Sequence, residues 1–85
     1  MSEFSQKLSE YIKQKDTNVY MLAKYCGYDR ANMYKLINGK RNAPDAEFVK
    51  KLSEYLHLSP SEEQELTEKY HISVMGYENY HGKIS

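Results

Sequence analysis

Residues 22–41 constrain the fold of this 85-residue chain more than any other segment. Apolar residues at helical spacing on either side of Gly27 predict two short helices, because glycine readily ends a helix in the left-handed conformation. Asp29 stands where a carboxylate can cap the second helix, which is predicted over residues 30–37. An Asn-Gly pair then ends that helix with a turn. This order of elements is typical of proteins that place the second helix in the major groove of DNA.

Positive charge is concentrated in the same part of the chain. The whole chain carries 12 Lys/Arg and 12 Asp/Glu, so its formal net charge is zero. Residues 24–53, however, carry seven basic and three acidic residues, a net of +4, whereas residues 54–85 carry six acidic and two basic residues, a net of −4. Because phosphate responds to the local patch and not to the sum, the middle of the chain is suited to nucleic acid. The alternative is a solvated helix face on which the charges cluster by chance.

Helical spacing of apolar residues continues on both sides of this segment. It predicts a first helix over about residues 3–15 and a second helix that Asn18 caps. After the third helix, over residues 30–37, it predicts a fourth helix with Pro44 in its first turn and a fifth helix after Ser59. Ser59 opens a capping box with proline at the first helical position. We therefore predict an all-α fold class, a compact five-helix domain that contains a helix-turn-helix.

The helical pattern breaks down after Tyr70. We predict a DNA-binding domain over residues 1–70 and a C-terminal tail or linker over residues 71–85. In this region Tyr70, Tyr77 and Tyr80 suggest an amphipathic interface surface, with a half-ordered tail as the equal alternative.

Taken in order, these features resemble the lambda-repressor/Cro-like helix-turn-helix domains, the XRE family. The residues that carry the resemblance are Leu22, Ala23, Gly27, the helix over residues 30–37, Asn38, Gly39, Lys40, Arg41 and Pro44. The resemblance covers about residues 4–70. Two positions depart from the family pattern: Val19 stands where a phosphate-holding glutamine is common, and Ile37 stands where a polar residue is common.

The resemblance implies a bacterial transcriptional regulator that binds double-stranded DNA and lies in the cytoplasm, associated with the nucleoid. We expect a homodimer on DNA, since one such domain buries little surface on a duplex. The tail is similar to the junction that precedes a sensing or oligomerisation domain in longer regulators. We therefore expect this chain to be the N-terminal, DNA-binding part of a longer protein.

The exposed face of the second helix of the pair is expected to read bases, because Arg and Lys donate to guanine, Asn pairs with adenine, and Ala can pack on a thymine methyl. The expected base-reading residues are Arg30, Ala31, Asn32 and Lys35. Residues on the flanking helix and loop are expected to contact phosphate. This phosphate set is Asn18, Tyr20, Lys24, Tyr34, Lys40 and Arg41. The alternative is that all are ordinary solvated residues, with the rings of the two tyrosines lying on the domain surface.

No catalytic, metal or cofactor set is visible in the sequence, and we expect neither an enzyme nor a cofactor. Cys26 is the single cysteine and is interpreted as a small core residue. The three histidines lack metal-ligand spacing with it. No apolar run approaches the ~18 residues that a membrane span requires.

Two alternatives stay open. The first is an antitoxin-like or adaptor module whose acidic, Tyr-rich C-terminal half binds a partner protein, since the net charge of −4 over residues 54–85 does not suit DNA. The second is a phage-type immunity or maintenance repressor with the same DNA chemistry.

Overall fold

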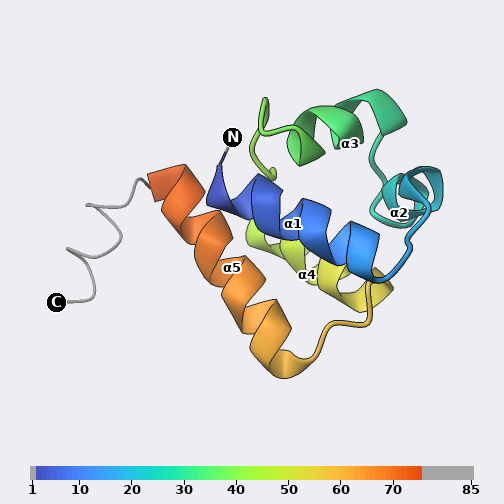
Figure 1. The fold of residues 1–85 in the computed structure, drawn as a ribbon. Helices are drawn as coiled ribbons and strands as arrows, with labels where there is room; N and C mark the ends of the chain where they lie inside the picture. The colour runs from blue at the N-terminus through green and yellow to red at the C-terminus, as the bar shows by residue number, and fades with distance from the viewer. Residues whose placement is uncertain (1, 76–85) are drawn as a thin grey trace, which may run out of the picture.

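Five α-helices account for most of residues 2–75, the part of the chain that the computed structural model describes (Figure 1). They are α1 (Glu3–Gln14), α2 (Val19–Tyr25), α3 (Arg30–Ile37), α4 (Ala46–Tyr55) and α5 (Pro60–Met75). No strand occurs among the described residues, and the predicted all-α five-helix fold is confirmed. Tyr77, Tyr80 and most of the predicted tail lie outside the described residues.

A side chain caps the start of every helix and satisfies a backbone N–H that the helix itself leaves unpaired. The capping residues are Ser2, Asn18, Asp29, Asp45 and Ser59. At α5 the capping box is reciprocal: the Ser59 hydroxyl accepts from the Glu62 N–H at 3.2 Å, and the Glu62 carboxylate accepts from the Ser59 N–H at 2.8 Å. The latter hydrogen bond lowers the pKa of Glu62.

The start of α4 differs from the prediction. Pro44 was expected in the first turn of this helix, but the helix begins at Ala46. The carboxylate of Asp45 accepts from the Phe48 N–H at 2.8 Å and is the cap. Pro44 therefore lies in the loop before the helix, because the stronger capping residue follows it.

The core lies where α1, the central helix of Figure 1, meets its neighbours. Helix α1 packs against α3 and α5, while α4 packs against α2 and α5. Each helix contributes fully buried apolar side chains, which include Leu8, Leu22, Met33, Leu36, Val49, Leu52 and Leu66. This shared core fixes α2 and α3 to the other three helices.

Helix α5 is longer than expected and crosses the boundary predicted at residue 70. The ring of Tyr70 packs edge-on against Phe4 of α1, with ring centroids 6.2 Å apart. The carboxylate of Glu65 accepts from the Tyr11 hydroxyl at 2.9 Å and pairs with Lys7 at 3.1 Å. The pKa of Tyr11 is raised to about 12, mainly because its side chain is buried and secondly because its hydroxyl donates to Glu65. These contacts hold α5 along α1.

Cys26 follows α2 and lies in the core, as predicted. Burial raises the pKa of its thiol from 9.0 to about 11, because a thiolate is disfavoured away from water.

We expect alkylation of Cys26 by iodoacetamide at pH 8 to be roughly a hundredfold slower in the folded protein than in urea, since the thiolate fraction falls by that factor. Equal rates in the two states would contradict the burial of this side chain.

Candidate nucleic-acid interface

The turn between α2 and α3 is closed by backbone hydrogen bonds. The N–H of Gly27 donates to the Lys24 carbonyl at 3.2 Å, and the N–H of Tyr28 donates to the Ala23 carbonyl at 2.8 Å. Gly27 has φ +68, and a Cβ there would meet nothing within 4 Å, so the backbone conformation and not crowding requires glycine. The ring of Tyr28 then packs on Phe48, with centroids 4.7 Å apart. The turn is thereby anchored to α4.

Helix α3 has one buried and one exposed face. Met33 and Leu36 are fully buried, and the hydroxyl of Ser9 on α1 donates to the carbonyl of Ile37 at 3.2 Å. Of the four expected base-reading residues, three are exposed and one is half-buried. The exposed three are Arg30, Ala31 and Lys35, and the half-buried one is Asn32.

Asn32 is hydrogen-bonded at both ends of its amide. Its Nδ2 donates to Oδ2 of Asp29 at 2.9 Å, and its Oδ1 accepts from Nη1 of Arg41 at 2.7 Å. The other carboxylate oxygen of Asp29 accepts from the Ala31 N–H at 2.9 Å and caps α3. The structure therefore brings Arg41, expected at phosphate from its loop position, into contact with α3. No pattern in the sequence pointed to this link.

Arg30 lies beside α2. Its guanidinium carbon is 5.7 Å from the ring centroid of Tyr20, a cation–π arrangement between the beginnings of α2 and α3. A hollow of about 220 Å³ at this point is lined by Tyr20, Lys24, Arg30 and adjacent residues. Tyr20 remains 52% exposed, so its hydroxyl is accessible to a ligand.

The other residues of the expected phosphate set are exposed around α3. Asn18 uses its Oδ1 to accept from the Met21 N–H at 3.1 Å, which confirms it as the cap of α2. Tyr34 is 47% exposed on α3. Lys24 lies on α2, and Lys40 lies in the loop after α3, where its N–H donates to the Lys35 carbonyl at 2.8 Å.

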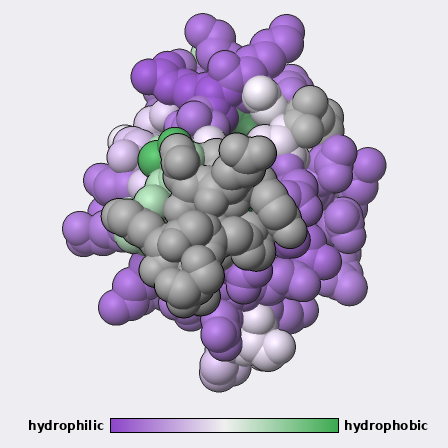
Figure 2. Space-filling view, turned by 90° about the vertical axis from the view of Figure 1, so that its left-hand side faces the viewer, coloured by the Kyte–Doolittle hydropathy of each residue, from purple (hydrophilic) through white to green (hydrophobic). Residues whose placement is uncertain are grey.

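The positive charge of this surface is not neutralised by ion pairs. Within residues 2–75, the ion pairs are confined to α1 and α5. Five cations around α3 therefore form no ion pair with residues 2–75, and we call them the cationic face: Lys24, Arg30, Lys35, Lys40 and Arg41. The face of the molecule seen in Figure 2 is mainly hydrophilic, with a small hydrophobic area beside the grey residues.

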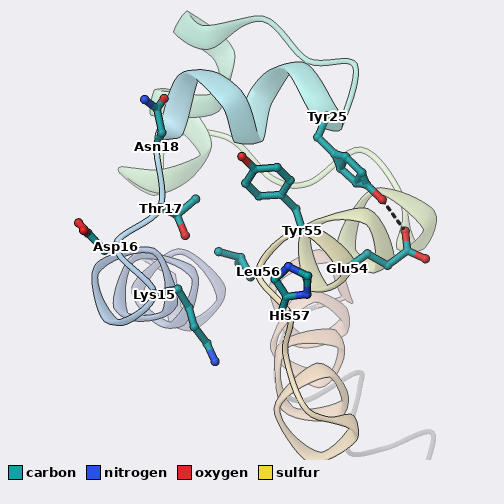
Figure 3. Close-up of a pocket in the computed structure, with 9 residues that line it drawn as sticks. All are labelled: Lys15, Asp16, Thr17, Asn18, Tyr25, Glu54, Tyr55, Leu56 and His57. Atoms are coloured by element: carbon teal, nitrogen blue, oxygen red, sulfur yellow. Dashed lines mark hydrogen bonds between the residues drawn. The ribbon is translucent and has the colours of Figure 1, made fainter.

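A larger hollow, of about 670 Å³, lies between the α1–α2 loop and the end of α4 (Figure 3). On one side of it the Tyr25 hydroxyl points to the Glu54 carboxylate at 3.4 Å, and the ring of Tyr25 packs on Tyr55. The charge of Glu54 raises the pKa of Tyr25. Lys15 and Asp16 lie on the other side (Figure 3). Of the expected DNA contacts, Asn18 alone lines this hollow.

The described part of the chain contains no cluster of three or more His, Cys, Asp or Glu side chains arranged to hold a metal ion. None of the helices in residues 2–75 combines the length and apolar character needed to cross a membrane.

Comparison with known proteins gives two matches. The sequence model of a family described as the Cro/C1-type HTH DNA-binding domain matches residues 7–63, from α1 into the first turn of α5. The chain is also 39% identical, over 58 residues, to a Bacillus subtilis (strain 168) protein named "Uncharacterized HTH-type transcriptional regulator RghRB". The aligned segment is 68% of this chain and 42% of that protein, so the chain spans less than half of its relative. No solved structure matches the chain.

Proposed function

The chain belongs to the family of Cro/C1-type helix-turn-helix DNA-binding domains, and on that premise we propose that it is the DNA-reading domain of a bacterial transcriptional regulator, with α3 in the major groove. The observation that carries the proposal is the cationic face, which surrounds a helix whose opposite face is buried in the core. Phosphate contacts supply most of the affinity of such an interface, and base contacts supply its sequence preference. The name of the Bacillus relative supports regulation over an antitoxin-like or adaptor role.

The exposed residues of α3 are placed to read bases. We assign base reading to Arg30, Ala31 and Lys35, and we consider Asn32 separately below. The remaining exposed donors are assigned to phosphate: all but Tyr34 lie outside α3, and Tyr34 lies on the helix itself and offers its hydroxyl. These donors are Asn18 through its Nδ2, Tyr20 and Tyr34 through their hydroxyls, Lys24 and Lys40.

We propose further that two copies bind one operator, with half-sites about 34 Å apart or a multiple of it. The role is non-enzymatic and belongs to the cytoplasm, at the nucleoid. The chain beyond α5, which ends at Met75, would link the DNA-reading domain to a sensing or oligomerisation domain. The length of the Bacillus relative supports such an arrangement.

Arg30→Ala and Lys40→Ala test the division between base and phosphate contacts. After selection of a preferred site from random duplexes, we expect Arg30→Ala to weaken binding to that site about 5- to 150-fold and to change binding to random duplexes far less. Lys40→Ala is expected to weaken both alike and to reduce the salt slope by about 0.9 for each copy bound. Fluorescence anisotropy at fixed salt measures both. Equal losses by Arg30→Ala on all sequences would contradict its base-reading role.

A further inference from the structure

The amide of Asn32 is already engaged by protein groups. Reading adenine with two hydrogen bonds needs its Oδ1 to accept from the base and its Nδ2 to donate to the base. In the structure Oδ1 accepts from Arg41 at 2.7 Å, and one hydrogen of Nδ2 is donated to Asp29 at 2.9 Å. The side chain is also half-buried. One lone pair of Oδ1 and one hydrogen of Nδ2 are therefore used within the protein, and the two bonds hold the Asn32 amide in a fixed orientation.

Arg41 has donors to spare in the same arrangement. A guanidinium carries five N–H groups, and one hydrogen of Nη1 is used in the bond to Asn32. The remaining donors include both hydrogens of Nη2 and the N–H of Nε, a planar fork that matches O6 and N7 of guanine. Arg41 is exposed, and no carboxylate of residues 2–75 forms an ion pair with it.

The hydrogen-bonded chain runs from the cap of α3 to the loop that follows the helix. Asp29 accepts from both the Ala31 N–H and the Asn32 amide, so the cap also orients Asn32. Asn32 in turn holds the guanidinium of Arg41, nine residues later, beside the N-terminal half of α3. A long side chain that is held before binding loses less conformational freedom when it meets DNA.

We propose that Arg41 reads a guanine beside α3 and that Asn32 is its positioning residue, and not a reader of adenine. This inference rests on the proposed function, because it assumes that α3 enters the major groove. It changes two sequence-based assignments: Arg41 moves from the phosphate set to the base-reading set, and Asn32 supports it.

The test compares Arg41→Lys, Arg41→Ala, Asn32→Ala and the Asn32→Ala/Arg41→Ala double variant on the selected site and on duplexes with single base-pair changes. We expect wild type to prefer one G·C pair about 5- to 150-fold, Arg41→Ala to lose that preference, and Arg41→Lys to weaken it, because lysine keeps the charge but not the planar fork. Asn32→Ala should flatten the preference at the same pair. The double variant should bind no more weakly than Arg41→Ala, because the two residues act as one unit.

Three results would overturn the proposal. The first is that Arg41→Ala keeps the full base preference, as the loss of a phosphate contact would. The second is that Asn32→Ala removes preference at an A·T pair that Arg41→Ala leaves intact, and the third is that the two losses add in the double variant. Should Asn32→Ala not fold, Arg41→Ala decides alone, since Arg41 lies on an exposed loop. The proposed function fails differently: wild type itself then binds all duplexes alike.

Discussion

Leu36→Ala is expected to lower the free energy of unfolding by about 2–5 kcal/mol, the usual cost of deleting a fully buried leucine and leaving a cavity. Leu36 lies on α3 with 0% of its surface exposed, within the core that all five helices share. Single domains of this size have a total stability of about 5–15 kcal/mol, so the loss is a large fraction of it. Urea denaturation followed by circular dichroism measures the change.

Tyr34→Ala is the matched control for this variant. Tyr34 lies on the same helix but is 47% exposed, so its removal leaves no cavity in the core. We expect its effect on unfolding to stay within about 0.5 kcal/mol. A loss below about 1 kcal/mol for Leu36→Ala, or equal losses for the two variants, would show that the buried face of α3 does not anchor the helix.

The helices and the core could be predicted because both depend on local patterns. Apolar residues at helical spacing around Gly27 predicted two short helices, and in this segment Leu22, Cys26, Met33 and Leu36 are buried while Ile37 is partly buried. The predicted capping residues gave the first residue of most helices to within one position. The start of α4 was wrong because two adjacent residues both suit a helix N-terminus, and the side-chain hydrogen bond of Asp45 decides between them.

The end of α5 could not be predicted from periodicity. This helix continues past Tyr70 to Met75, where the spacing of apolar residues no longer indicates one buried face. Its position along α1 depends on contacts between residues more than 50 positions apart, such as the hydrogen bond from Tyr11 to Glu65. A pattern read along the chain does not contain such partners.

The candidate interface was predictable in its charge but not in its geometry. Composition alone placed a net positive charge in the middle of the chain. Asp29, the cap of α3, and Asn32 are three residues apart, and this spacing indicates that their side chains can form a hydrogen bond. The contact of Arg41 with Asn32 had no such signal, because it depends on the path of the loop and on the rotamer of a long side chain. The roles of the individual residues on DNA stay predictions.

DNA affinity is expected to fall steeply with salt, because each lysine or arginine that neutralises a phosphate releases a counterion. Five cations make up the cationic face, so one domain has a maximum slope of log K against log salt of about −4.5. This slope corresponds to a loss of up to roughly 500-fold between 50 and 200 mM salt. Two copies on one operator would double the slope, to about −9. Anisotropy titrations on the selected site at several salt concentrations measure it.

Lys24→Ala and Lys13→Ala separate the cationic face from the rest of the surface. Lys24 belongs to that face, whereas Lys13 on α1 lines a hollow beside Glu62 and Glu65 of α5. Removing Lys24 should reduce the slope by about 0.9 for each copy bound, and removing Lys13 should leave it unchanged. A wild-type slope steeper than about −5 requires more cations than the cationic face of one domain supplies, as is expected when two copies bind. A slope near zero, or equal reductions by both variants, would contradict a phosphate contact through this face.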